Sequence, residues 1–364
     1  MKHQTIGIIG GGQLGLMIAQ EAALAGARTI ALDPSADAPV FAVTNEHIVA
    51  GFDNLEALDE LCRRSDVVTY EFENVRGEVL SSLAARYNIK QGIRQLLDSQ
   101  DRLREKQNAR RNGLKTPRFE AVDSRRDLDE AVKRLGYPCV FKTRTFGYDG
   151  HGQVVLRSND DLSKTDDLVG RPAIVEEYID FDFEASVVAV ADGKKIITFP
   201  VGRNVHRDGI LDLSVVPAEC DAKVADKMVA ATKKFMRKCR YQGILAIEYF
   251  VKGNEIFFNE MAPRPHNSGH YTIEGCDTNQ FRELCRYLLG EPLQEPHLLG
   301  PTVMKNILGR DLDVAQEIAA ENRPDVHVHL YGKKESRPLR KMGHITFVGT
   351  TAEDFDKNWK QRFK

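Results

Sequence analysis

Short, mostly apolar runs recur in the first quarter of the chain, and a longer segment lies between the first two. The runs have the length of buried strands, and the longer segment has the length of a helix. The predicted strands are residues 5–9, 29–33, 46–49 and 67–70, and the predicted helix is residues 16–25. A strand–helix–strand order predicts parallel pairing, because the helix carries the chain back across the sheet. We therefore expect a doubly wound, Rossmann-like α/β domain ending near residue 95.

The pattern then changes to short strands joined by turns, with two helices between them. A charged helix is predicted at residues 98–112, and Gly113 to Pro117 break it. The expected strands are residues 137–142, 154–156, 173–178, 183–190, 194–200, 244–251 and 255–259, and an amphipathic helix is expected at residues 222–238. The first two of these strands flank a glycine-rich loop, residues 146–153, and so predict a hairpin with a flexible tip.

A proline-rich stretch, residues 290–301, precedes a third region of alternating strands and helix. Its expected strands are residues 302–308, 326–331 and 344–348, and its expected helix is residues 352–363. We expect three domains, residues 1–95, 96–295 and 296–364, the last one small and β-rich.

Composition narrows the class of protein. A chain of 364 residues predicts two or three domains. With 51 Lys plus Arg against 53 Asp plus Glu, neither a nucleic acid nor an anionic membrane is expected as the main partner. The six cysteines show no metal-binding spacing, and neither a signal peptide nor an apolar run of about 20 residues is recognised. A cytoplasmic enzyme is the simplest expectation.

The first turn has the spacing G-x-G-x-x-G at Gly10, Gly12 and Gly15, with Asp33 about 20 residues on. This pattern is typical of a site for NAD or FAD. It is equally typical of a tight strand-to-helix turn that needs glycine. The N-terminus of the following helix could then face another kind of phosphate. From the motif alone both interpretations stay open.

Lys142 ends an apolar strand just before the glycine-rich loop, and Arg144 follows it. Glycines let backbone N–H groups close over phosphate oxygens, and a lysine supplies the opposite charge. The Walker spacing is absent, so this is not a P-loop. A mobile hairpin with an exposed lysine is the alternative, but the combination favours nucleotide-phosphate binding.

Acidic residues follow two further strands. Glu176 and Glu177 end one strand and Glu184 begins the next, where an adenine and a ribose could bind, although a solvated acidic strand end is the commoner case. Glu248 and Glu260 lie on strands joined by a short hairpin, so they can converge. Paired carboxylates on apolar strands are costly without a cation, and Mg²⁺ bridging ATP phosphates is the natural candidate.

Two polar loops complete the candidate chemistry. Arg264 suits capture of a carbonate-like anion and His266 suits proton transfer. The basic loop at residues 331–344 is most simply a solvated face, but it could also seat a phosphate monoester.

Taken in order, these motifs resemble the N5-carboxyaminoimidazole ribonucleotide synthetases, an ATP-grasp family of bacterial and fungal purine synthesis. The resemblance covers essentially the whole chain. It rests on GGGQLG at residues 10–15, EFENV at 71–75, QDR at 100–102, Lys142, GYDGHGQ at 147–153, NEMAPRPHNSGH at 259–270 and the loop at 333–344. One departure is His151, where the family often has lysine, and it would weaken phosphate contact from that loop.

The resemblance implies an ATP-grasp fold with a lid over about residues 115–178, a Rossmann-like N-terminal domain and a small β-rich C-terminal domain. It also implies the reaction: 5-aminoimidazole ribonucleotide, ATP and bicarbonate give N5-carboxyaminoimidazole ribonucleotide, ADP and phosphate through carboxyphosphate. Mg²⁺ and a homodimer are implied as well.

Site residues are carried over by motif position only. The implied ATP contacts are Arg102, Lys142, Gly147, Tyr148, Asp149, Gly150, His151, Gly152, Gln153, Glu176, Glu177, Tyr178, Ile179, Glu184, His206, Asn259 and Glu260. The implied metal ligands are Glu248 and Glu260, and the implied catalytic residues are Arg264, His266, Tyr148 and Asp149. The implied contacts of the ribonucleotide are Gly12, Gln13, Leu14, Glu73, Asn267, Lys333 and Arg340.

Three other functions compete with this one. A formate-using glycinamide ribonucleotide transformylase would share the ATP-grasp fold, but the Arg264 to His270 motif favours carboxylation. An NAD-dependent oxidoreductase would use the N-terminal turn and leave Lys142, Glu248 and Glu260 without a role. A nucleotide-binding regulator without activity is disfavoured by the intact acids.

Overall fold

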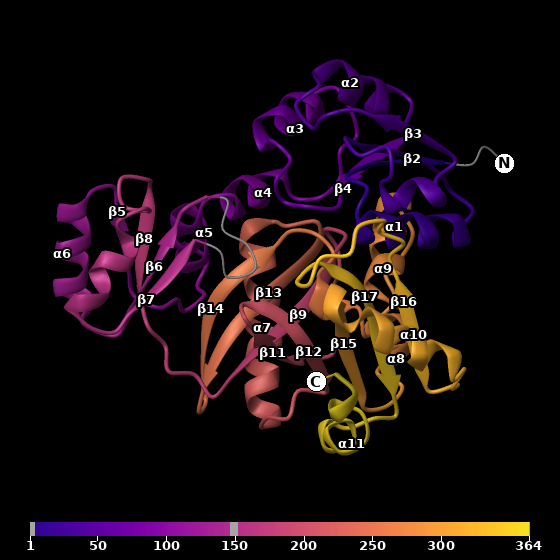
Figure 1. Ribbon diagram of the computed structural model, residues 1–364. Helices are drawn as coiled ribbons and strands as arrows, with labels where there is room; N and C mark the ends of the chain where they lie inside the picture. The colour runs from indigo at the N-terminus through magenta and orange to yellow at the C-terminus, as the bar shows by residue number, and fades with distance from the viewer. Residues whose placement is uncertain (1–3, 146–151, 364) are drawn as a thin grey trace.

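The computed structural model describes residues 4–145 and 152–363. Within these residues the strands form three sheets, which Figure 1 shows as an upper N-terminal unit, a small lateral unit and a large central one. No helix in the described ranges is long and apolar enough to cross a membrane.

The N-terminal sheet is parallel, with strand order β3-β2-β1-β4. Its strands are β1 (Thr5–Ile9), β2 (Arg28–Asp33), β3 (Glu46–Val49) and β4 (Val67–Tyr70), and its helices are α1 (Gln13–Leu24), α2 (Leu55–Arg63) and α3 (Gly77–Ala84), with the 3-10 turn η1 (Pro39–Ala42). The predicted strands are confirmed, and α1 begins three residues earlier than the expected residue 16. Gly10 has φ +104°, and a Cβ there would lie 2.4 Å from Cγ of Glu71, so the turn requires glycine.

The single helix predicted at residues 98–112 is wrong. The chain forms α4 (Ile93–Ser99) and α5 (Arg102–Arg111) instead. Asp101 interrupts them because its carboxylate accepts hydrogen bonds from the backbone N–H groups of Leu103 and Arg104, which makes it the N-cap of α5.

The lateral unit is an antiparallel sheet of order β5-β8-β6-β7, covered by a helix (Figure 1). Its elements are β5 (Phe119–Val122), α6 (Arg125–Leu135), β6 (Cys139–Thr143), β7 (Gln153–Leu156), the 3-10 segment η2 (Asn159–Thr165) and β8 (Ala173–Glu177). Leu128, Phe141 and Val175 are fully buried in its own small core. The predicted β6–β7 hairpin is confirmed by the pairing of Lys142 with Gln153, while the loop between them lies outside the described residues.

The central sheet is antiparallel throughout its described strands, in the order β14-β13-β9-β11-β12-β15-β17-β16, and β10 pairs with β9. The strands up to the hairpin are β9 (Phe183–Ala191), β10 (Ile196–Thr198), β11 (Gly202–Arg207), β12 (Ile210–Val216), β13 (Gly243–Lys252) and β14 (Glu255–Ala262). The helices and 3-10 turn of this part are α7 (Ala222–Cys239), η3 (Asn267–Gly269), α8 (Thr272–Gly275) and α9 (Gln280–Leu289). The strands β11 and β12 have no counterpart in the predicted elements.

The C-terminal strands extend this sheet, because β15 pairs with β12. The elements are β15 (Thr302–Leu308), η4 (Gly309–Asp311), α10 (Leu312–Ala320), β16 (Val326–Leu330), β17 (Lys341–Val348), α11 (Ala352–Asn358) and η5 (Lys360–Phe363). The helix predicted at residues 352–363 is therefore too long, since α11 ends at Asn358.

One core crosses from the N-terminal unit to the central one. Ile18 and Ala22 of α1 share a buried cluster with Phe281, Leu284 and Leu288 of α9. Burying a side chain of the size of Leu or Phe contributes roughly 1.5–3 kcal/mol, so these contacts hold the parallel sheet against the central sheet. The space that remains open between the units is the cavity described next.

Candidate active site

A cavity of about 590 Å³ lies where the three sheets meet. The predicted site residues that line it are Gln13, Leu14, Glu73, Arg102, Lys142, Gln153, Glu184, His206, Glu248, Asn259, Glu260, Arg264, His266 and Asn267. They come from the lateral and central sheets, from α1 and α5, and from the segments after β4 and β14. The structure thus brings together residues that are more than 200 positions apart in the chain.

Lys142 and a second lysine share one buried carboxylate. Lys142 Nζ donates to Oε2 of Glu176 at 3.0 Å, and Nζ of Lys106 lies 3.2 Å from Oε1 of the same residue. Burial alone would raise the pKa of Glu176, but the two lysine charges outweigh it and lower that pKa to about 2. Burial lowers the pKa of Lys106. With a positive charge on either side, we take the ionised form of Glu176 as the stable one.

The α5 helix presents Arg102 and Glu105 to the cavity. Nη1 of Arg102 donates to Oε2 of Glu260 at 3.2 Å, and Oε1 of Glu105 accepts from the backbone N–H of Met261 at 2.8 Å. Burial raises the pKa of Glu260 by itself, but the charges of Arg102 and Lys142 outweigh it and lower that pKa. Burial first, and then the charge of Glu260, raises the pKa of Glu105.

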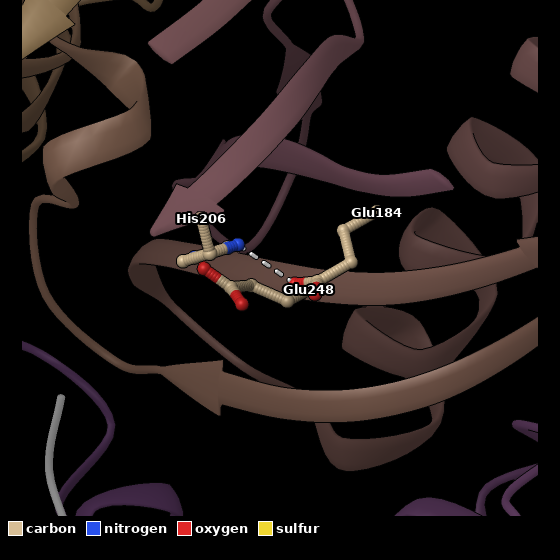
Figure 2. Close-up of side chains that lie close together, drawn as sticks. All are labelled: Glu184, His206 and Glu248. Atoms are coloured by element: carbon tan, nitrogen blue, oxygen red, sulfur yellow. Dashed lines mark ion pairs between the residues drawn. The ribbon is translucent and has the colours of Figure 1, made fainter. Parts of the chain in front are cut away.

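Glu248 and Glu260 face each other across the β13–β14 hairpin, as predicted. Glu248 also lies beside Glu184 and His206, and the ligand atoms of these three are within 4.8 Å of one another (Figure 2). Nδ1 of His206 is 2.9 Å from Oε2 of Glu184. Burial, followed by the negative charge of Glu260, raises the pKa of Glu248. Burial alone would lower the pKa of His206, but Glu184 and Glu248 raise it to about 9, so a protonated ring balances part of the negative charge in this corner.

The segment after β14 presents Arg264, His266 and Asn267. Arg264 binds both oxygens of Glu73, and its Nη2 lies 2.8 Å from Oε1. Burial opposes ionisation of Glu73, yet the Arg264 charge and hydrogen bond lower its pKa to about 2. Both polar side-chain atoms of Asn267 are buried without a hydrogen-bond partner among the described residues. Such orphaned atoms indicate a place for a ligand or water.

His266 is held as a neutral ring. Burial and the Arg264 charge lower its pKa to about 3. Nδ1 accepts from the backbone N–H of Ser268 at 3.3 Å, and Nε2 is 3.5 Å from Oε1 of Glu248. Because Nδ1 accepts, we assign the proton of the neutral ring to Nε2, which faces the cavity wall formed by Glu248.

Carboxylates of the protein accept hydrogen bonds from the backbone N–H groups of the glycine turn. The N–H groups of Gly12 and Gly15 donate to the carboxylate of Glu71, and the N–H of Gly11 donates to Asp33 Oδ2 at 2.8 Å. In a dinucleotide site these N–H groups face a pyrophosphate and the acid binds a ribose. Here two carboxylates already occupy the donors, which favours the interpretation of a tight turn over a site for NAD.

Other predicted residues do not line the cavity. Nζ of Lys333 donates to Oε1 of Gln13 at 2.9 Å, so it supports a lining residue. Arg340 is exposed and donates to the carbonyl of Glu335. Glu177 forms a salt bridge with Arg118, and the guanidinium of Arg157 lies over the ring of Tyr178. The remaining predicted residues away from the lining are Gly12, Gly152, Glu176 and Ile179.

Five predicted residues, Gly147, Tyr148, Asp149, Gly150 and His151, lie outside the described residues. Conversely, the cavity includes residues to which the sequence assigned no role, notably Glu105 and Lys341. Glu105 follows Arg102 by three residues on α5, and that spacing puts both on one helix face. The same spacing could have identified Glu105 once Arg102 was suspected.

Comparison with known proteins agrees with this geometry. The family models that match are the ribonucleotide synthetase preATP-grasp domain at residues 2–98, the ATP-grasp domain at residues 107–281 and the phosphoribosylaminoimidazole carboxylase C-terminal domain at residues 302–358. An N5-carboxyaminoimidazole ribonucleotide synthase of Staphylococcus haemolyticus is 42% identical over 99% of this chain and 96% of its own.

Solved structures give the same result. The N5-carboxyaminoimidazole synthetase of Staphylococcus aureus complexed with ADP has a TM-score of 0.95 at 39% identity, covering 100% of this chain and 98% of its own. The Aspergillus clavatus enzyme, in complex with ADP and 5-aminoimidazole ribonucleotide, has a TM-score of 0.91 at 28% identity, covering 99% of this chain and 97% of its own.

Fold and site together define an ATP-grasp ligase. The three matched models, the parallel N-terminal sheet and the lysine and carboxylates converging on one cavity all belong to that class. The chain belongs to the N5-carboxyaminoimidazole ribonucleotide synthase family, which works in purine biosynthesis.

Proposed function

We propose that this enzyme carboxylates the exocyclic amine of 5-aminoimidazole ribonucleotide with bicarbonate, using ATP. The observation that supports this most is the convergence of Lys142, the Glu248–Glu260 pair and Arg264 on one cavity. A phosphate-binding lysine, a cation site and an anion-binding arginine are what a ligase needs to activate a small oxyacid.

The ATP half of the site lies between the lateral and central sheets. Lys142 would release Glu176 to meet the phosphates, and Arg102 would neutralise charge beside Glu260. Glu184 and His206 line the same cavity beside Glu248, and they are proposed to hold the nucleoside. Gly152 and Gln153, and the residues before them in the loop, are proposed to cover the phosphates, as the sequence resemblance implies.

Mg²⁺ is proposed as the cation. Glu248 and Glu260 offer carboxylate oxygens on neighbouring strands, which is the donor type Mg²⁺ prefers. Burial and the charge of Glu260 raise the pKa of Glu248, which supports the proposal because a bound cation would offset both effects. When bound with ATP, the ion would neutralise negative charge on the transferred phosphoryl group.

The chemistry proceeds in two steps. An oxygen of bicarbonate attacks the γ-phosphorus, the bond to ADP breaks, and carboxyphosphate forms. The ribonucleotide amine then attacks the carboxyl carbon, phosphate leaves, and the amine loses a proton. Arg264 would hold bicarbonate and carboxyphosphate with its planar donors, Asn267 has unpaired polar atoms for the same groups, and His266 would hold or move a proton at Nε2.

The ribonucleotide is proposed to bind on the N-terminal side. Gln13 and Leu14 line the cavity there, Glu73 borders it, and Lys333 stands behind Gln13 to meet the phosphate. Arg340 would have to turn from Glu335 to reach that phosphate. A homodimer and a cytoplasmic location stay predictions from the sequence.

The test is an ADP-release assay with ATP, Mg²⁺ and bicarbonate, with and without 5-aminoimidazole ribonucleotide. We expect the ribonucleotide to stimulate release and to be consumed in equal amount. Stimulation by glycinamide ribonucleotide with formate, and none by the aminoimidazole, would favour the transformylase instead. Calorimetric titration with NAD is expected to show no binding, and a tight complex would revive the oxidoreductase.

A further inference from the structure

Gln91 has a backbone conformation that a glutamine rarely adopts. Its φ is +103°, one of four positive values among the described residues other than glycine. It lies in the link between α3 and α4, and only 5% of its surface is exposed. A residue held in this region persists only where its surroundings over-determine it.

The Gln91 amide joins two parts of the molecule. Its Oε1 accepts from Oγ1 of Thr69 at 2.7 Å, and its Nε2 donates to the carbonyl of Tyr70 at 3.3 Å. The same Nε2 donates to the carbonyl of Pro263 at 2.8 Å. Thr69 and Tyr70 end β4 of the N-terminal sheet, whereas Pro263 follows β14 of the central sheet. The hydroxyl of Thr69 also fixes which end of the amide faces Pro263.

Both partners of this amide adjoin residues of the site. Glu71 follows Tyr70 directly, Glu73 comes three residues after Tyr70, and Arg264 comes directly after Pro263. Two links therefore hold the segment of Glu73 to the segment of Arg264. One is the Gln91 amide, and the other is the ion pair between Arg264 and Glu73.

The segments packed around Gln91 leave little room for its backbone to shift. A Cβ on Gly243, at the start of β13, would lie 3.2 Å from Cα of Gln91, and one on Gly92 would lie 2.4 Å from the ring of Tyr241. Nζ of Lys90 donates to the carbonyls of Tyr287 and Leu288 at the end of α9. Residues 90–92 of the link thus each contact the central unit.

We propose that Gln91 is a positioning residue: its side-chain amide, held on a strained backbone, keeps Arg264 aligned with the N-terminal side of the cavity. This inference rests on the proposed function. Carboxyphosphate would form at Arg264 while the amine is bound beside Glu73, so transfer requires the two sides to stay aligned. A shift of about 1 Å between reacting groups can cost about 100-fold in rate. Carboxyphosphate that misses the amine reacts with water, which returns bicarbonate and phosphate.

Loss of the amide is therefore expected to uncouple the two steps. Gln91→Gly keeps the backbone conformation and removes all three hydrogen bonds. Its kcat for ribonucleotide consumption should fall about 10- to 100-fold, while ADP release falls less, so the ratio of ADP formed to ribonucleotide consumed rises above one. Thr69→Val removes only the bond that orients the amide and should shift the ratio in the same direction by a smaller amount.

The matched control is Arg240→Gly, which relieves a positive φ of 52° at the end of α7, away from the cavity. Its ratio should stay at one. A Gln91→Gly enzyme with lower thermal stability but a ratio of one would overturn the proposal, because Gln91 would then serve packing alone. If that variant does not fold, a ratio of one in Thr69→Val overturns it. Failure of the wild-type enzyme to consume the ribonucleotide would instead refute the proposed function.

Discussion

Lys142 and Glu176 form a buried ion pair at 3.0 Å that a bound nucleotide would have to open. The pair joins β6 to β8 inside the lateral sheet, and Lys106 on α5 supports the carboxylate from its other side. If Lys142 turned to a phosphate, Glu176 would keep Lys106 as its partner. The second lysine would then lower the cost of freeing the first, because no buried charge would be left alone.

Lys142→Ala is expected to weaken ATP binding by at least about tenfold, since a charge-assisted hydrogen bond of about 1.5–3 kcal/mol is lost. Calorimetry with ADP and the KM for ATP measure the effect. Lys164→Ala serves as the control, because Lys164 is an exposed lysine in the same lateral unit. Equal affinity in the two variants would remove Lys142 from the phosphate site.

Glu176→Gln should destabilise the fold by about 3 kcal/mol at neutral pH, because it leaves two buried lysines without a counter-charge. The pKa of Glu176 is lowered to about 2 in the fold, below the value of about 4.5 in an unfolded chain. Its stabilisation is therefore complete above pH 4.5 and is lost as the pH falls towards 2. Denaturant unfolding of both proteins from pH 7 down to pH 3 should show the gap narrowing only below pH 4.5; a gap that is constant over this range contradicts the assignment.

Glu260→Gln is expected to lower turnover at least about 100-fold, since the proposed Mg²⁺ site would lose one of its two carboxylates. Binding of Mn²⁺ in the presence of ADP, followed by electron paramagnetic resonance, gives a readout independent of activity and should weaken in parallel. Glu255→Gln is the matched control, because Glu255 is exposed on the same strand and pairs with Lys115. Normal turnover in Glu260→Gln would refute its role as a ligand.

If Lys333 binds the phosphate of the ribonucleotide, as proposed, binding is expected to depend on pH. Burial, with the charges of Arg340 and Lys341, lowers its pKa to about 8, so the ammonium is charged below that pH and neutral above it. The KM for the ribonucleotide should rise as pH increases through 8. Lys333→Arg keeps its charge and should flatten this rise, whereas Lys333→Ala should raise KM already at pH 7.

The adjacent Lys334 is exposed and pairs with Asp37, so Lys334→Ala should keep the wild-type profile. An unchanged KM in Lys333→Ala at pH 7 would exclude Lys333 from the phosphate site.

Local patterns predicted the elements that depend on near neighbours. The strands β1 and β4 match their predicted ranges, because each is a mainly apolar run bounded by polar or turn residues. The β13–β14 hairpin was also predictable, since a short turn makes neighbouring strands antiparallel and brings Glu248 opposite Glu260. The break at Asp101 was missed, because the charged residues on both sides favour a helix equally well and only the capping geometry ends one.

Long-range pairing could not be read in this way. In the sequence, Lys106 looks like one more charged residue on an exposed helix. In the structure it is fully buried, and it forms an ion pair with Glu176 of β8. The ion pair between Arg264 and Glu73 joins residues 191 positions apart. Gln91 shows no signal in the sequence, since both its conformation and its amide partners come from segments brought together by folding.

The sequence by itself determined the motifs and hence the family: the glycine turn, Lys142, the acids on the hairpin and the Arg264 to His270 segment are local patterns whose order is specific. Only the tertiary structure decided how these groups are charged and aligned. Burial and opposing charges at distances of about 3 Å set the pKa values, and such distances arise only when three sheets pack around one cavity. The glycine turn shows the difference: its spacing suited a dinucleotide equally well, until Glu71 and Asp33 were found on its backbone donors.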